Sequence, residues 1–216
     1  MMRVATFLFL SAIACSNALA QSPAPVERPE FVIGDRWVLR YVDLYNNEEL
    51  NKWELKVSGL HDDSVRFASV TLANKDASKV GKSSKATASR STLTFGNGLI
   101  VEGKEVRFDF PLEVGKTWKY DYKTRRNDGK GFTTFSVNAK VEGWEEVEVP
   151  AGKFKALKVT HTTAYFTETG GMTYNNQVLR TYWYSPEVKR EVKYEFIDRA
   201  TAGDRSRTEL VEYEVK

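Results

Sequence analysis

The amino-acid sequence predicts an all-β protein of about ten to twelve antiparallel strands, arranged as a curved sheet, an incomplete barrel or a sandwich of two related halves. Three observations predict this fold class. Apolar residues alternate with polar ones along most of the chain, turn-forming residues separate the alternating runs, and one phrase occurs twice. After residue 20, no run has the apolar stripe of an amphipathic helix.

The first element is a targeting segment over residues 1–20. Arg3 provides a positive start, residues 4–14 form a mostly apolar run, and Ala18 and Ala20 have the small-x-small spacing of a signal-peptide cleavage site. The apolar run is shorter than the ~20 residues that a membrane-spanning helix needs. We therefore expect cleavage after Ala20, a periplasmic or secreted protein, and no transmembrane segment.

Cys15, the only cysteine, leaves a lipoprotein as the alternative. Cleavage before Cys15 fits less well, because Ala12 stands where lipoprotein signals usually carry Leu. Removal of Cys15 leaves a chain that forms no disulfide and performs no thiol redox chemistry. Residues 21–30 contain three prolines and few apolar side chains, which predicts a flexible leader before a single β domain over 31–216.

The repeated phrase organises that domain. Gly-Asp-Arg-Trp-Val-Leu-Arg-Tyr over residues 34–41 corresponds to Gly-Lys-Thr-Trp-Lys-Tyr-Asp-Tyr over 115–122, 81 positions later. In each copy a glycine ends a turn, and a tryptophan three residues on begins a strand. Lys-Val-Ser-Gly over 56–59 and Lys-Val-Glu-Gly over 140–143 extend the repeat. We therefore expect two related halves, about 31–110 and 111–216.

Period-two alternation defines the strands in order. Trp37, Leu39 and Tyr41 share one face of the first strand, and Trp118, Tyr120 and Tyr122 share one face of a later one. Similar runs cover residues 53–57, 135–141, 192–196 and 211–215. Turns are predicted at Asn97-Gly98, Asp128-Gly129, Gly170-Gly171 and 149–152, and Gly143 is a candidate bulge inside a long strand.

Three runs in the second half carry a family resemblance. They are Pro-Leu-Glu-Val-Gly-Lys-Thr-Trp-Lys-Tyr at 111–120, Val-Glu-Val-Pro-Ala-Gly-Lys-Phe-Lys-Ala at 147–156 and Tyr-Trp-Tyr-Ser-Pro-Glu-Val at 182–188. In this order they resemble the TapB-like family, exported bacterial β domains of unknown function. The resemblance covers 105–200, implies an exported all-β domain and carries over no active site. Lys189 and Arg190 depart from it, because a small turn residue is typical there.

Catalytic and metal-binding motifs are not found. The two histidines, His61 and His161, lie 100 residues apart, and His61-Asp62-Asp63 is typical of a turn. Alternation points His161 toward the interior. Glu146 and Glu148 share one strand face, but neighbours on an exposed face usually point into water. We therefore expect a protein that is not an enzyme and uses no cofactor or metal.

The charges exclude one class of partner and leave another open. A net charge of +3 is a poor match for nucleic acid. Residues 73–90 and 123–130 are locally basic, which predicts solvated loops or contact with an anionic surface.

The aromatic residues indicate either a filled core or a face that binds a hydrophobic, lipid-like ligand. The candidate ligand-binding residues are Trp37, Tyr41, Trp118, Tyr122 and His161. The alternative function is an envelope protein–protein interaction module that uses edge strands or the segment 73–90.

Overall fold

A computed structural model describes residues 24–62, 64–89, 100–125, 131–199 and 204–216. The predicted targeting segment with Cys15 lies outside the described residues. So do Asp63 and the turns predicted at Asn97-Gly98 and Asp128-Gly129. The other predictions can be compared with the structure.

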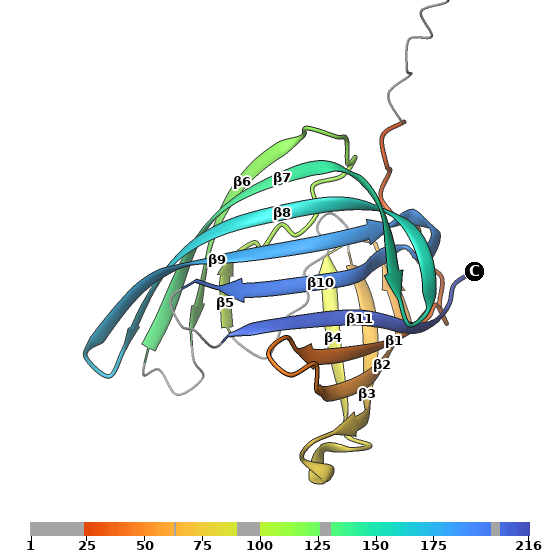
Figure 1. Ribbon diagram of the computed structural model, residues 1–216, viewed down its shortest axis with the longest axis horizontal. Coiled ribbons are helices and arrows are strands. Elements are labelled where there is room, and N and C mark those ends of the chain that lie inside the picture. The colour runs from red at the N-terminus through yellow and green to blue at the C-terminus, as the bar shows by residue number, and fades with distance from the viewer. Residues whose placement is uncertain (1–23, 63, 90–99, 126–130, 200–203) are drawn as a thin grey trace, which may run out of the picture.

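The described chain forms one antiparallel sheet of eleven strands in the order β4-β3-β2-β1-β11-β10-β9-β8-β7-β6-β5 (Figure 1). The strands are β1 Arg36–Asp43, β2 Glu49–His61, β3 Ser64–Asn74, β4 Ser83–Ser89, β5 Ile100–Gly103, β6 Thr117–Arg125, β7 Gly131–Val149, β8 Gly152–Thr169, β9 Met172–Ser185, β10 Arg190–Asp198 and β11 Arg205–Glu214. Two short 3-10 helices complete it, η1 Ala77–Lys79 and η2 Pro186–Val188. The prediction of an all-β fold is confirmed.

The sheet coils on itself but does not close. Figure 1 shows β6 to β10 arching over one side, with β1 to β4 turning beneath them. The two free edges belong to β4 and β5, which are consecutive strands in the chain. Of the three predicted arrangements, the incomplete barrel is therefore the one observed, with an inner face and an outer face.

The repeated phrase forms the same backbone structure twice. Gly34 and Gly115 have φ of 100° and 87°, a region that favours glycine. The amide of Gly34 donates to the carbonyl of Val57 at 3.0 Å, and that of Gly115 donates to Val141 at 2.9 Å. Each valine amide donates back to the residue after the glycine, at 2.8 Å and 2.9 Å. The two tryptophans therefore enter their strands from matching turns.

The likeness continues into the next strand pair. The register shifts between Val57 and Gly59 where β2 meets β3, and between Val141 and Gly143 where β7 meets β8. The bulge predicted at Gly143 is thus confirmed, and it has a counterpart in the first half. The two halves are also joined by strand pairing, because β5 of the first half pairs with β6 of the second.

Two tight turns also follow the sequence. Gly170 and Gly171 join β8 to β9 with φ of 59° and 78°, both in the left-handed region. Pro150 and Ala151 join β7 to β8, where Val149 pairs with Gly152. Both predicted turns are confirmed.

The segment 73–90 differs from the predicted loop. Its described part comprises the end of β3, η1 and the edge strand β4. Two of its lysines form ion pairs, Lys75 with Glu48 at 2.6 Å and Lys79 with Asp76 at 3.8 Å. At the start of β4, Ser83, Ser84 and Lys85 are exposed, which is typical of an edge strand. The two interaction surfaces considered from sequence, an edge strand and this segment, therefore coincide at β4.

Two hydrophobic clusters form the core. The first joins Trp37 and Phe67 of the early strands to Phe154 near the tip of the β7–β8 hairpin and to Val188 of η2. The second lies under the arch and includes Phe108 and Leu112 from the segment between β5 and β6.

The described part of the leader joins the second cluster. Val26 is buried and exchanges backbone hydrogen bonds with Leu112 at 2.9 Å and 2.8 Å. The leader expected to be flexible is therefore held at this residue, because one apolar side chain among the prolines finds a buried position.

Candidate functional site

Strand register places all five predicted ligand-binding residues on the inner face. Tyr41 pairs with Thr208, Thr208 with Tyr194 and Tyr194 with Tyr182, a row that crosses the sheet from β1 to β9. A neighbouring row connects Trp118 through Ala139 to His161. Trp37 and Tyr122 lie on the same side by alternation along β1 and β6.

The five residues do not form one site. Trp37 is fully buried in the first cluster, and its Nε1–H donates to the Val188 carbonyl at 2.8 Å. Trp118 is half-buried beside the second cluster, and its Nε1–H donates to the Val106 carbonyl at 2.9 Å. Both indoles are anchored to backbone, so these two residues serve the core.

Tyr122 and His161 belong to a cluster that alternation only partly predicted. The ring of Tyr122 stacks on Phe135 with centroids 4.4 Å apart, and Tyr120 lies 6.0 Å from Tyr122. Tyr165 extends the row, with its ring 6.3 Å from that of Phe135. We define the inner aromatic site as the inward side chains that these rings form together with their neighbours on β8, β9 and β10. Its members are Tyr120, Tyr122, Phe135, Thr163, Tyr165, Arg180, Tyr194 and Phe196.

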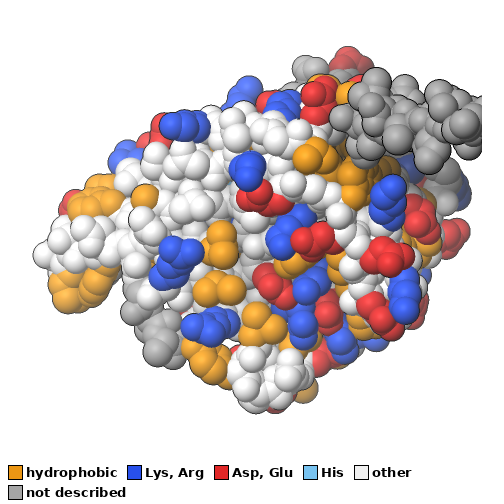
Figure 2. Space-filling view, turned by 45° about the horizontal axis from the view of Figure 1, so that its top comes forward, with side chains coloured by type: hydrophobic (Ala, Val, Ile, Leu, Met, Phe, Trp, Pro, Cys, Tyr) orange, Lys and Arg blue, Asp and Glu red, His pale blue; other side chains and the backbone are white. Residues whose placement is uncertain are grey.

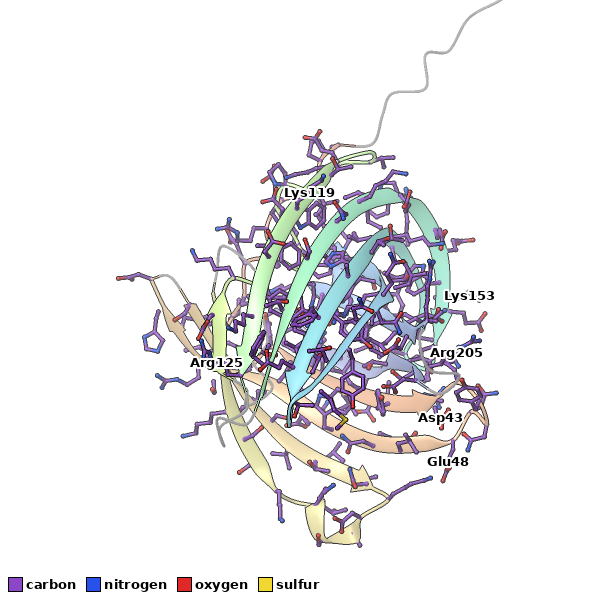
Figure 3. The ribbon with its side chains drawn as sticks, turned by 90° about the vertical axis from the view of Figure 1, so that its left-hand side faces the viewer. Asp43, Glu48, Lys119, Arg125, Lys153 and Arg205 are labelled. Carbon is purple, nitrogen blue, oxygen red and sulfur yellow. The ribbon has the colours of Figure 1, made fainter. Side chains whose placement is uncertain are left out.

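The inner aromatic site lies at the open end of the incomplete barrel. Figure 3 views this end, with Arg125 of β6 on one side and Asp43 and Arg205 on the other. Most of its aromatic side chains are half-buried, including Phe135, Tyr165 and Phe196. The opposite end is packed, because Phe108 is fully buried against Tyr182 and Tyr184 at centroid distances of 5.6 Å and 5.1 Å. The inner face is therefore packed at that end.

His161 forms the floor of the site. Its Nδ1 lies 3.1 Å from the Tyr120 hydroxyl, and its ring contacts Tyr182 at 4.9 Å. Burial, together with the positive charges of Arg107 and Arg180, lowers the pKa of His161 to about 3. The imidazole is therefore neutral near pH 7, and its Nδ1 shares a hydrogen bond with the Tyr120 hydroxyl.

The tyrosines remain protonated at neutral pH. Burial raises the pKa of Tyr122 to about 12, with Arg180 opposing the rise. Burial likewise raises the pKa of Tyr120 and Tyr194. The site thus offers hydroxyl groups and ring faces, and none of these groups is poised as a nucleophile or general base near neutral pH.

Arg180 is the residue that the sequence-based site missed. It lies on β9 between Val178 and Tyr182, so it occupies an inward position in an otherwise apolar alternation. A charged residue at such a position was a signal available in the sequence. The other missed residues, among them Phe135, Tyr165 and Phe196, are ordinary strand aromatics without a distinguishing pattern.

A hollow also lies across strands β5 to β8. It is an open trough of about 630 Å³ whose lining includes Lys123, Ser136 and Phe166, together with Tyr122, Phe135 and Tyr165 of the inner aromatic site. The Ser136 hydroxyl donates to Asp121 at 2.6 Å, and Lys123 covers the Phe132 ring at 4.0 Å. Figure 2, which views one face of the molecule, shows Lys and Arg side chains interspersed with Asp and Glu over a large part of that face. This trough has no buried polar group aimed into it among the described residues.

Both carboxylates considered from sequence, Glu146 and Glu148, are exposed, and neighbouring Glu145 is hydrogen-bonded. Glu145 accepts hydrogen bonds from Trp183 Nε1 at 2.8 Å and from Lys158 at 2.9 Å, which lower its pKa. Glu148 is exposed beside Lys153 at 3.6 Å. Within the described residues, no three His, Cys, Asp or Glu side chains are placed to bind a metal ion. No described helix is long and apolar enough to span a membrane.

Comparisons with known proteins identify the fold. No family model and no curated protein matches the sequence. A protein from Bacteroides fragilis, described as exported and of YmcC-like fold, has a similar structure with a TM-score of 0.59, 15% identity, and coverage of 88% of this chain and 100% of that one. A protein from Parabacteroides distasonis described as a lipoprotein is similar, with a TM-score of 0.59, 16% identity, and coverage of 89% and 100%. At these identities the likeness extends to the fold alone.

Proposed function

We propose that this protein is an exported, non-enzymatic β domain that binds a lipid-like ligand at the inner aromatic site. The observation that supports the proposal most strongly is the group of half-buried rings at the open end of the barrel, above a packed floor. Rings such as Phe135 and Phe196 can bury an apolar chain that would otherwise contact water. Their half-buried state leaves part of each ring available for contact.

Export is part of this proposal. The first 20 residues predict a signal peptide, and the two structural neighbours are described as an exported protein and a lipoprotein. We also propose that the chain is a TapB-like protein. The three sequence runs in its second half support this, while no family model matches the sequence. Such a protein would carry or sense an amphiphile in the periplasm or outside the cell.

A displacement assay tests the proposal. The protein is loaded with N-phenyl-1-naphthylamine, whose fluorescence rises in apolar sites, and dodecanol is titrated as an uncharged competitor. We expect dodecanol to displace the dye from the wild-type protein. Phe135→Gln should weaken dodecanol binding about tenfold, because about 50 Å² of apolar contact contributes about 1.4 kcal/mol.

Phe166→Gln is the matched control. Phe166 lies on the neighbouring strand but on the outer face, where it is 39% exposed. The same substitution there should leave dodecanol binding unchanged. Absence of dye binding by the wild-type protein, or equal weakening by both substitutions, would overturn the proposal.

A further inference from the structure

Arg180 is a cation placed at an inward position of the sheet. It pairs with His161 on one side and with Phe196 on the other, so it lies in the middle of the inner face. Its guanidinium carbon lies 5.8 Å from the centre of the Phe135 ring and 5.7 Å from that of Phe196. The guanidinium therefore lies between these two rings.

The polar neighbours of Arg180 are neutral. Its Nη1 donates to the Thr163 hydroxyl at 3.0 Å, and the hydroxyls of Tyr122 and Tyr194 are also within reach. Among the described residues, no carboxylate forms an ion pair with Arg180. Glu105 acts on it only through its longer-range charge. Asp198 accepts a hydrogen bond from the Tyr165 hydroxyl at 3.1 Å.

The other inner arginines show the contrast. Arg107 donates to Glu191 at 3.2 Å, and Arg190 donates to the same carboxylate at 3.1 Å. Deep in the barrel, then, buried arginines share a carboxylate, as the cost of burying an unpaired charge requires. Arg180 lies nearer the open end and lacks such a partner.

This arrangement suits an anion. A guanidinium presents a planar fork of donors that matches carboxylate and phosphate oxygens, and it stays charged at every physiological pH. His161 is neutral and adds no competing charge. The flanking rings of Phe135 and Phe196 can hold the first methylene groups of a chain attached to the anion.

We propose that Arg180 binds the anionic headgroup of an amphiphile, a carboxylate or a phosphate ester, whose chain packs on the inner aromatic site. The inference rests on the proposed function and adds the chemistry of the headgroup to it. The shared feature of the two headgroups is a pair of oxygens that can accept from one guanidinium. Competing ligands with the same chain distinguish the two sources.

The test compares dodecanol, dodecanoate and dodecyl phosphate in the dye-displacement assay. With the wild-type protein, we expect the two anions to bind about 10- to 100-fold more tightly than dodecanol, as hydrogen bonds to a charged group allow. Arg180→Met should abolish the preference, so that the variant binds both anions no more tightly than it binds dodecanol. Arg180→Lys should retain part of the preference. The tighter of the two anions identifies the headgroup.

Arg66→Met is the matched control. Arg66 lies exposed on the outer face of β3, so its substitution removes one positive charge without touching the inner face. It should leave every affinity unchanged. Equal wild-type affinity for dodecanol and both anions would overturn the inference while leaving the proposed function standing. That comparison uses only the wild-type protein and so does not depend on how any variant folds. Failure of dodecanol itself to bind would instead contradict the proposed function.

Discussion

His161 should make the stability of this protein depend on pH in a defined window. The imidazole is fully buried, and its pKa falls from an ordinary 6.5 to about 3 on folding. Between these two values the unfolded chain binds a proton at His161 that the folded chain does not. Stability contributed by the neutral imidazole is therefore present above pH 6.5 and is lost as the pH falls below it.

The size of the effect follows from proton linkage. Between pH 8 and pH 5, a shift from 6.5 to about 3 removes about 2 kcal/mol from the free energy of unfolding. Complete protonation below pH 3 would bring the loss to about 5 kcal/mol. The physical cause is burial first, together with the charges of Arg107 and Arg180 that face the ring.

Urea denaturation followed by far-UV circular dichroism measures this loss. We expect His161→Gln to be less stable than the wild-type protein at pH 8, because the amide fits the packed position less well. The difference should shrink by about 2 kcal/mol at pH 5, since glutamine does not titrate. A difference between His161→Gln and the wild-type protein that stays constant from pH 8 to pH 5 would refute the reasoning.

Two further predictions concern the repeated phrase. Trp37→Phe should lower the free energy of unfolding by about 2–3 kcal/mol, and Trp118→Phe should lower it by about 1 kcal/mol. Both substitutions remove an indole hydrogen bond to a backbone carbonyl, but of the two tryptophans only Trp37 is fully buried. Denaturant titration would contradict this if Trp118 proved the costlier position. Gly115→Ala should cost about 1–2 kcal/mol from backbone strain alone, since an added methyl meets open space. At Gly143 an added methyl also meets open space, but φ is not left-handed, so Gly143→Ala should change the free energy of unfolding by less than about 0.5 kcal/mol. Equal shifts in melting temperature for Gly115→Ala and Gly143→Ala would disprove the strain argument.

The parts of the fold that local chemistry determines were predictable. Gly34 and Gly115 mark turns that need a positive φ, and alternation along β1 and β6 identified the inward side chains. What packs above those side chains was not predictable. Trp37 is sealed by Val188 of η2 and Trp118 meets Val106, and neither partner is near in the sequence.

The candidate site was predictable only in part for a similar reason. Alternation assigns Arg180 an inward position, but the distance from its guanidinium to Phe135 depends on the register of three strands. Phe108 fills the packed end from a segment in which Val106, Phe108 and Phe110 alternate with polar residues, a strand-like pattern, although the described segment between β5 and β6 forms no strand. The position of 73–90 at a sheet edge likewise depended on pairing with β3.

Among the described strands, β11 links β1–β4 to β5–β10, since it pairs with β1 on one side and β10 on the other. Arg36 near the beginning of the sheet pairs with Glu214. Strands β1 to β4 can pair with one another as soon as they are made, whereas the seam with β10 must wait for residues 205–214. Contacts of such long sequence separation slow folding. A polypeptide that crosses a membrane unfolded, N-terminus first, would therefore complete this sheet only on the far side.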